Sequence, residues 1–395
     1  MGKLQHSWGH GISRRNAVRG LAGFVAGSAL LHGQQDVFRD HSRIPAMDEL
    51  ETAFDFEANA FAKLPRDVFN YTAYGSSGEF TLRRNRSAFD EVELVPKSVV
   101  NVSTIDTSSV VCGTRMDFPI MVSPTAAHLT LHPDAEAATH TGCTAASNTP
   151  MIVSQNASLP FDKIAEAADG PLWFQLYPRE QLEANRAPLE TVQQSGYEAV
   201  VVTVDQQAAY YERRLHDRHL LNRGPRRRRP QRAPANPYRV PAFRLFYEWK
   251  MFEELRTIVH VPMLAKGILT GEDARLCVEN GLDGIIVSNH GGRSLDHVPS
   301  SLEVLPEIVD AVGGRIPVIV DSGFRRGTDV LKALALGASA VSLGRVPRWG
   351  LGAFGAPGVQ RVLEIIQQEL VMAMAHTGRP SLASIDNSLV RTDFS

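Results

Sequence analysis

The segment GIIVSNHGGRSLD, residues 284–296, places a histidine and an arginine three positions apart after an apolar run. His290 can remove a proton near neutral pH, where an imidazole titrates. Arg293 can hold a carboxylate through two parallel hydrogen bonds. Gly291 and Gly292 allow a sharp turn and the close approach of a ligand. The pattern predicts proton abstraction from an anionic substrate, whereas an isolated histidine would more simply be a hydrogen-bonded core residue.

Two further charged residues lie at or near the ends of apolar runs. Asp205 closes AVVVTVD, and it could orient His290 or stabilise its protonated ring. Lys266 lies near the end of PMLAKG. A lysine there is consistent with a Schiff-base nucleophile, a solvated cap, or a positive charge held against an electron-rich ring. The residue types alone leave these three readings open.

Glycines and arginines near the C-terminus indicate a phosphate site. Gly323 and Arg325 precede a helical pattern in DSGFRRGTDVLKALALG, and SLGR ends with Gly344 and Arg345. Backbone amides, a helix N-terminus and arginines together suit a phosphate group. Surface salt bridges are the alternative for both arginines.

The elements that must position these residues are eight short apolar runs separated by amphipathic segments. Strands that are apolar on both faces and alternate with helices predict a parallel sheet. Eight such units within about 225 residues predict an α/β fold, a closed (β/α)8 TIM barrel whose active site lies at the carboxyl ends of the strands. The runs are residues 120–126, 151–155, 173–177, 199–205, 262–267, 284–290, 317–323 and 340–345.

The barrel domain is expected to span residues 46–380, with an N-terminal helical extension before its first strand and a long insertion after strand four. The Arg/Pro-rich part of this insertion, about residues 216–240, predicts a mobile loop, with an anionic surface contact as the alternative. Residues 381–395 are expected to be a C-terminal tail.

Residues 1–45 stand apart from this pattern. Arg14 and Arg15 precede an apolar run, residues 21–31, and the segment resembles a twin-arginine export signal. It predicts a periplasmic location, with a cytoplasmic enzyme carrying an N-terminal extension as the alternative. No other segment is apolar enough to predict a transmembrane helix.

Composition narrows the classes of partner. With 41 Lys+Arg against 43 Asp+Glu, nothing global predicts nucleic acid as the main partner. Cys112, Cys143 and Cys277 lie far apart, so neither a zinc site nor a disulfide framework is expected, and no metal site is predicted.

The motifs SNHGGRSLD, MLAKG, PTAA, FQLY, TVD, DSGFRRGTDVLKALALGA and LGR closely resemble those of the FMN-dependent α-hydroxy acid oxidases and dehydrogenases. This is the group of glycolate oxidase, lactate oxidase and mandelate dehydrogenase, and the resemblance runs from about Leu64 to Arg379. It implies FMN as cofactor, oxidation of an (S)-α-hydroxy acid to an α-keto acid, and a homo-oligomer, commonly a tetramer.

The resemblance also implies roles for individual residues. His290 would receive the substrate's proton, and Asp205 would stabilise the imidazolium. Arg293 would bind the substrate carboxylate, while Tyr71 and Tyr177 would hydrogen-bond its carboxylate and hydroxyl. The implied FMN contacts include Lys266, which would stabilise negative charge on the reduced ring; the others are Pro124, Thr125, Ala126, Ser154, Gln175, Thr203, Ser288, Asp321, Gly323, Arg325, Gly344 and Arg345.

The sequence departs from the family pattern after strand four, where a second arginine is usual. Tyr211 or Glu212 falls at that position, and Arg213 follows. Arg213 reaches the site if a one-residue gap is allowed; otherwise carboxylate binding rests on Arg293.

Two positions bear on substrate and acceptor. Asn156 replaces the bulky aromatic residue of glycolate-type enzymes, so an altered substrate pocket is expected. Ala126 is the residue type that oxidases tend to have near the flavin, which favours oxygen as acceptor and hydrogen peroxide as product over a dedicated acceptor. The competing hypotheses are a flavin-barrel isomerase or Lys266-dependent lyase, and a flavin-binding barrel without catalysis.

Overall fold

The computed structural model describes residues 45–205 and 246–394. Contacts divide the chain into Met1–Pro45 and Ala46–Ser395, and all the helices and strands named below belong to the second unit. The predictions for Arg14 and Arg15, for the loop at 216–240 and for Arg213 fall outside the described residues. No helix in the described part of the chain is long and apolar enough to cross a membrane.

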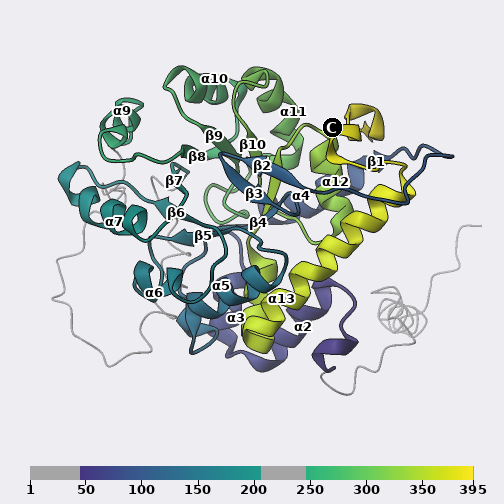
Figure 1. The fold of residues 1–395 in the computed structure, drawn as a ribbon, viewed down its shortest axis with the longest axis horizontal. Helices are drawn as coiled ribbons and strands as arrows, with labels where there is room; N and C mark the ends of the chain where they lie inside the picture. Colours follow the sequence, from purple (N-terminus) through teal and green to yellow (C-terminus); the bar gives the residue numbers. More distant parts are fainter. Residues whose placement is uncertain (1–44, 206–245, 395) are drawn as a thin grey trace, which may run out of the picture. The chain divides into compact units, whose positions relative to one another are not determined.

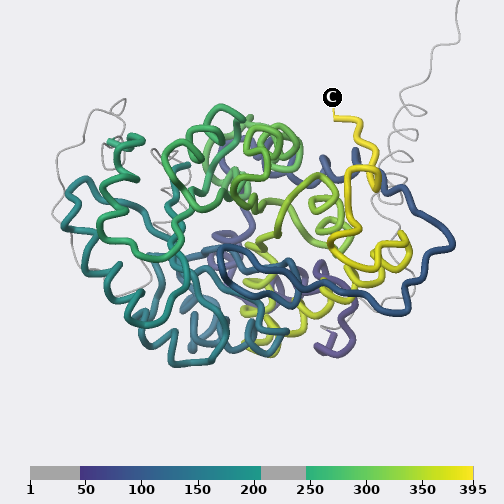
Figure 2. The backbone as a smooth tube through the Cα atoms, turned by 45° about the horizontal axis from the view of Figure 1, so that its top comes forward, coloured from purple at the N-terminus to yellow at the C-terminus, as the bar shows by residue number. Residues whose placement is uncertain are grey.

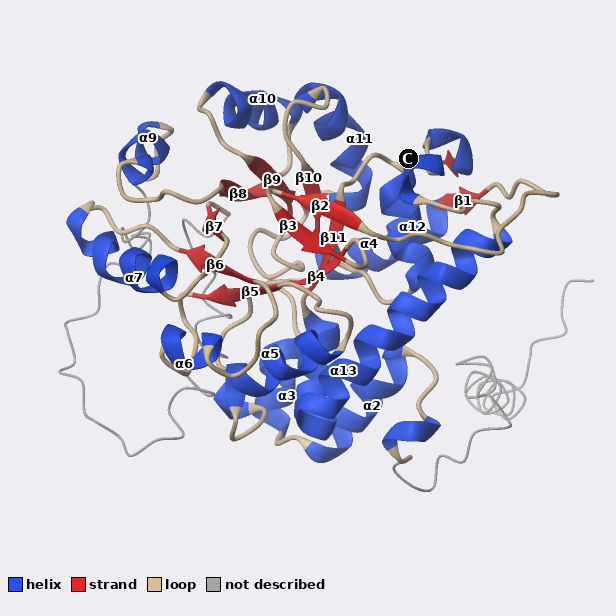
Figure 3. Cartoon of the chain, in the orientation of Figure 1, coloured by secondary structure: helices blue, strands red, loops and turns tan. Residues whose placement is uncertain are grey.

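Eight parallel strands close into a barrel, each pairing with the next along the chain and the last returning to the first (Figures 1 and 3). The closing pair aligns Val341 with Ile120. The predicted (β/α)8 barrel is therefore confirmed. Its strands are β4 (Ile120–Val122), β5 (Met151–Ser154), β6 (Leu172–Leu176), β7 (Ala199–Thr203), β8 (Met263–Ile268), β9 (Gly284–Val287), β10 (Val318–Val320) and β11 (Ala340–Leu343).

A helix follows each strand and covers the outside of the barrel. The helices are amphipathic, and their apolar faces pack on the outward-facing strand residues in one large buried cluster. The last helix contains Gly355, whose φ of 67° interrupts the helical geometry. The helices that cover the barrel are α5 (Ala135–Ala145), α6 (Phe161–Ala165), α7 (Glu183–Gln194), α9 (Lys250–Arg256), α10 (Gly271–Glu279), α11 (Ser301–Val312), α12 (Gly327–Ala335) and α13 (Arg345–His376).

A β-hairpin closes the amino-terminal end of the barrel. Strands β2 (Ser109–Val111) and β3 (Thr114–Met116) pair antiparallel, and their apolar side chains join the inward-facing strand residues in a second buried cluster. Trp173 of β6 donates from Nε1 to Thr114 Oγ1 at 2.8 Å. The barrel interior at this end is thus filled by side chains.

Helices before the barrel and a short C-terminal sheet complete the unit. Helices α2 (Ala53–Lys63), α3 (Arg66–Ala73) and α4 (Phe80–Ser87) precede β1 (Val92–Leu94). In Figure 2 the purple N-terminal helices lie against the yellow α13, a contact that includes the ring pair Phe56–Phe354 at 6.0 Å. The segment expected to be a tail forms β12 (Val390–Thr392), which pairs with β1.

The strands stop earlier than most of the apolar runs. The run 284–290 contributes only Gly284–Val287 to β9. Beyond the strand, His290 has φ of 59° and the next two glycines have φ of 65° and 71°. Left-handed backbone cannot continue a strand, so His290 and Arg293 lie in the loop after β9, whereas Lys266 remains within β8.

Candidate active site

A buried lysine lies at the carboxyl end of the barrel. Lys266 is 3% exposed, and its Nζ donates to Ser288 Oγ at 2.6 Å and lies 3.1 Å from Asp321 Oδ2. Burial alone would lower its pKa, but Asp321, then Asp205 and Tyr177, outweigh this and raise it above its ordinary value. Lys266 is therefore a cation inside the barrel mouth.

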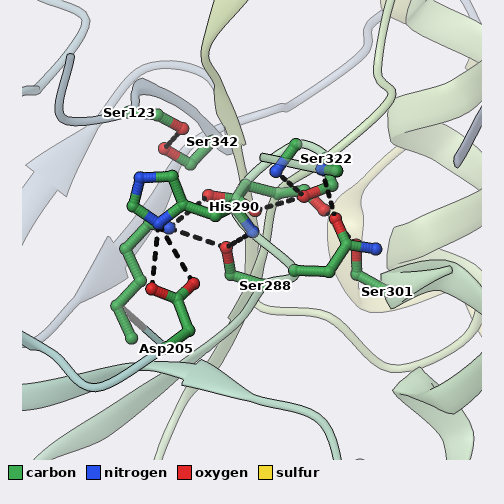
Figure 4. Close-up of polar contacts among 12 residues, drawn as sticks. Ser123, Asp205, Ser288, His290, Ser301, Ser322 and Ser342 are labelled. Carbon is green, nitrogen blue, oxygen red and sulfur yellow. Dashed lines mark hydrogen bonds and ion pairs between the residues drawn. The ribbon is translucent and has the colours of Figure 1, made fainter. Parts of the chain in front are cut away.

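His290 pairs with Asp205 across the mouth (Figure 4). The Nδ1 atom lies 2.9 and 3.1 Å from the two carboxylate oxygens, and the His290 backbone N–H donates to Ser288 Oγ at 3.0 Å. Because a carboxylate only accepts, Nδ1 carries the proton, and Nε2 is the basic atom of the neutral ring. The pair is thus arranged for a base whose charged form is stabilised by a neighbouring anion.

The loop after His290 is joined to the lysine cluster. The Gly291 N–H donates to Ser322 Oγ at 3.0 Å, and Ser322 donates to Asp321 Oδ1 at 2.8 Å (Figure 4). A Cβ on Gly292 would lie 2.7 Å from the Leu82 backbone nitrogen, so only glycine fits there. These contacts connect the histidine loop and the lysine cluster in one polar network.

Arg293 lies against the tyrosines of α3 and the turn after it. Its Nη1 donates to the carbonyls of Tyr71 at 2.5 Å and Tyr74 at 3.2 Å. The guanidinium carbon is 5.0 and 4.5 Å from the centroids of the two rings. Of the other predicted substrate residues, Tyr177 follows β6 and is held by its N–H donating to Gln155 Oε1 at 2.6 Å.

Two buried polar atoms at the strand ends have no hydrogen-bond partner among the described residues: Gln175 Nε2 and Thr203 Oγ1. Gln175 Oε1 does accept from Ser154 Oγ at 3.1 Å. Since buried polar groups are nearly always paired, the two orphan atoms indicate a ligand in the mouth.

Pro124, Thr125 and Ala126 follow β4. Thr125 Oγ1 lies 2.7 Å from His128 Nε2. Burial, and then Arg348, hold the pKa of the His128 ring well below its ordinary value, so this ring is neutral. It connects Thr125 to Thr139, whose Oγ1 is 2.9 Å from Nδ1, and so fixes the loop that carries Ala126.

The loop after β10 carries Gly323 and Arg325, two of the residues predicted to bind phosphate. Gly323 has φ of 94°, and a Cβ there would lie 2.1 Å from the Asn85 carbonyl oxygen. The Arg325 N–H donates to Asp329 Oδ2 at 2.8 Å, and burial lowers the pKa of its guanidinium to about 10. A Cβ on Gly344, after β11, would meet only Ser123 Cβ, at 3.9 Å, which leaves space beside the backbone.

The guanidinium of Arg345, which was predicted to bind phosphate, donates hydrogen bonds to three backbone carbonyls. Nε donates to the Thr72 carbonyl at 2.8 Å, Nη1 to that of Gly291 at 2.9 Å and Nη2 to that of Tyr74 at 3.0 Å. Burial, followed by the charges of two neighbouring arginines, lowers its pKa to about 9. Its guanidinium thus joins α3 to the histidine loop.

Sequence reasoning missed several residues of this network. The buried side-chain amides of Asn85 and Asn289 bond reciprocally at 2.7 and 2.8 Å and join α4 to the histidine loop. Ser322 and Arg348 were also missed. Asn289 and Ser322 lie within motifs quoted above, and Arg348 is three residues after Arg345, so their closeness in sequence to predicted site residues could have indicated them. Nothing in the sequence indicated Asn85.

Comparison with known proteins identifies the family. Residues 60–392 match the family described as FMN-dependent dehydrogenase. The chain belongs to this family. It is 38% identical over 356 residues to the peroxisomal (S)-2-hydroxyacid oxidase GLO3 of Arabidopsis thaliana, covering 88% of this chain and 98% of that protein. It is 39% identical over 355 residues to 2-hydroxyacid oxidase 1 of Homo sapiens, covering 85% and 95%.

Solved structures agree with this assignment to the FMN-dependent dehydrogenase family. Mandelate oxidase with (S)-2-phenylpropionate superposes with a TM-score of 0.77 at 34% identity, covering 88% of this chain and 99% of that one. Flavocytochrome b2 gives a TM-score of 0.80 at 31% identity, covering 89% of both chains. The protein is therefore an FMN-dependent oxidoreductase.

The residues present fit FMN. A buried cation, Lys266, and the orphan atoms of Gln175 and Thr203 supply polar contacts for a ring system and its chain. The backbone beside Gly344 is open to a phosphate group, whereas Gly323 packs closely on the Asn85 carbonyl. Within residues 45–205 and 246–394, no group of three or more His, Cys, Asp or Glu side chains is placed to hold a metal ion.

Proposed function

We propose that this protein oxidises an (S)-2-hydroxy acid to a 2-keto acid with FMN. The observation that carries the proposal is the His290–Asp205 pair, with Nδ1 2.9 Å from Oδ1. The loop of His290 also carries Arg293, and Ser288 accepts hydrogen bonds from both the His290 N–H and buried Lys266. A base and a carboxylate-binding cation on one short loop suit a substrate with a hydroxyl beside a carboxylate. The printed names of the relatives, 2-hydroxyacid oxidases, support the same substrate class.

Arg293 and Tyr71 would hold the carboxylate, and Tyr177 would hydrogen-bond the hydroxyl. His290 Nε2 would then take one proton, from the substrate's α-carbon or hydroxyl, and the Asp205 carboxylate at Nδ1 would stabilise the imidazolium that forms. FMN, when bound, would supply the acceptor for the two electrons and the second proton of the oxidation. The side chains thus orient the acid and hold the proton.

Lys266 would hold the flavin end of the site. Its positive charge, maintained by Asp321 at 3.1 Å, suits a ring that becomes anionic on reduction. The ring edge and ribityl chain would be contacted by Ser154, Gln175, Thr203 and Ser288, and the ribityl hydroxyls by Asp321. The backbone of Pro124, Thr125 and Ala126 would lie along the ring, and Gly323, Arg325, Gly344 and Arg345 would bind the phosphate.

Oxygen is the proposed electron acceptor, with hydrogen peroxide as product. Ala126, the residue type that oxidases tend to have, supports this choice, and a family member using another acceptor is the alternative. An oxygen electrode combined with a peroxide assay during turnover distinguishes the two, because a dye-dependent enzyme would reduce dyes while consuming little oxygen.

We also propose that the enzyme is a homotetramer, and that residues 1–45 form a twin-arginine signal directing it to the periplasm. Light scattering during size-exclusion chromatography tests the first. Cell fractionation of the Arg14→Lys, Arg15→Lys variant beside the wild type tests the second, and an unchanged location would favour the cytoplasmic alternative.

Anaerobic mixing with glycolate, lactate, mandelate and longer-chain acids tests the central proposal, since the flavin absorbance of the holoenzyme should bleach with at least one (S)-acid. His290→Gln should keep FMN and lose this reduction. Protein that binds FMN but is bleached by no acid would support a barrel without hydroxy acid catalysis. Protein that binds no FMN would overturn the proposal.

A further inference from the structure

Arg348 is a buried arginine on the first turn of α13. It is 3% exposed; Nε donates to Thr72 Oγ1 at 3.0 Å and Nη1 to the Ala126 carbonyl at 2.5 Å. Nη2 is buried and has no hydrogen-bond partner among the described residues. A guanidinium nitrogen left in this state is costly, so it points to an acceptor that is bound during function.

The same guanidinium lies beside the tyrosine assigned to the substrate. The Arg348 guanidinium carbon is 5.5 Å from the Tyr71 ring centroid, and that of Arg293 is 5.0 Å from the same centroid. Two cations therefore border one aromatic ring. Burial lowers the pKa of Arg348 to about 10, while Tyr71 acts to raise it and Arg293 to lower it. Arg348 stays protonated at neutral pH.

Glu136 offsets part of the repulsion between these two like charges, and an anion bound beside them would offset more of it. In a site of low effective dielectric, each cation favours a negative ligand over a neutral one of the same shape. Arg348 also joins Tyr71's helix to the loop of Ala126, through Thr72 and the Ala126 carbonyl. Its position therefore influences both charge and orientation at the carboxylate end.

We propose that Arg348 is a second cationic determinant of substrate specificity, a positioning residue that acts with Arg293 around Tyr71 to select a carboxylate. The proposal rests on the proposed function, since it concerns that substrate's carboxylate. It provides, from α13, the second positive charge that the resembled family usually carries after strand four. Arg213, the earlier candidate, lies outside the described residues.

The test compares Arg348→Gln with Arg115→Gln, which removes an exposed arginine of β3 at the opposite end of the barrel. Dissociation constants come from anaerobic flavin reduction by the best 2-hydroxy acid and by its neutral primary amide. Arg348→Gln should weaken the acid about 10-fold, equal to ~1.4 kcal/mol, and leave the amide within about 2-fold. Arg115→Gln should leave both unchanged. Equal weakening of acid and amide would mean a purely structural role and would overturn the proposal, as would no change in either.

A failure of the proposed function is distinguishable from a failure of this inference. If no hydroxy acid reduces the wild-type flavin, oxalate is titrated against the oxidised holoenzyme and its binding is followed by flavin absorbance. A dissociation constant about 10-fold weaker in Arg348→Gln than in Arg115→Gln supports the role of Arg348, and equal constants refute it. If the glutamine variant does not hold FMN, Arg348→Lys should keep the preference for acid over amide; losing it would contradict a role for the charge.

Discussion

Replacing Asp205 by Asn removes the negative charge beside the proposed base, His290, while keeping a hydrogen-bond acceptor of the same shape. Asp205 Oδ1 lies 2.9 Å from His290 Nδ1, and the two side chains are 8% and 18% exposed. At an effective dielectric constant of about 20, unit charges at this separation interact by roughly 6 kcal/mol. Partial exposure and the nearby Lys266 charge reduce this, so we expect a loss of about 2–4 kcal/mol of imidazolium stabilisation.

That loss corresponds to a fall of roughly 30- to 1,000-fold in the rate of flavin reduction at saturating substrate. Stopped-flow absorbance under anaerobic conditions measures the rate directly and separates it from reoxidation. FMN should remain bound, which the absorbance spectrum of the gel-filtered protein reports.

Asp283→Asn is the matched control, because Asp283 forms a half-exposed ion pair with Arg256 at 2.7 Å, away from the His290 network. It should change the reduction rate by less than about 2-fold. A similarly small effect of Asp205→Asn would refute the assignment of Asp205 as the group that stabilises the protonated histidine.

Three further predictions concern the scaffold. Gly267→Ala places a Cβ 2.5 Å from Asp205 Cβ at a φ of 111°, so it should slow flavin reduction. Gly281→Ala is the control, because Gly281 has a φ of 68° and no atom within 4 Å of the added Cβ. It should lower the unfolding free energy by about 1 kcal/mol and leave the rate of flavin reduction unchanged. Lys266→Met leaves Asp321 buried without its cation and should lower the unfolding free energy by about 3–5 kcal/mol at pH 7. Because folding raises the pKa of Lys266 above 10.5, its contribution to the unfolding free energy is complete below pH 10.5 and is lost as pH rises through the folded-state pKa. Urea titrations should therefore show the difference in unfolding free energy between wild type and variant becoming smaller in that pH range. A difference that stays constant would contradict this prediction. Thr114→Val removes the acceptor of Trp173 Nε1 and should lower the unfolding free energy by about 1–3 kcal/mol in a denaturant titration, without slowing flavin reduction. Thr141→Val, on the exposed face of α5, is the control and should lower the unfolding free energy by less.

The barrel was predictable because its signal is local and repeated. Each strand is a short run that is buried on both faces, and each is followed by an amphipathic helix. Strand ends were less predictable, since the apolar run 284–290 continues past β9 into left-handed backbone at His290. A positive φ at a histidine leaves no mark in hydrophobic periodicity.

Some contacts of the candidate site were predictable from the sequence, and others were not. The approach of Asp205 to His290, 85 residues apart, follows from barrel topology, because all strand ends meet at one face. The contacts of Arg345 and Arg348 do not follow from it. They depend on how α3 docks on the barrel mouth, and docking of one helix on another element is set by side-chain packing that a single sequence does not reveal.

The β2–β3 hairpin has a consequence for turnover. Val111, Met116 and Trp173 fill the base of the barrel, so among the described residues the amino-terminal end is packed with side chains. If the proposed function holds, substrate, product and electron acceptor would then approach from the carboxyl end and could compete for the same route. Tyr71 and Arg293, the proposed substrate residues, would in that case influence how long the product stays as well as how well the substrate binds.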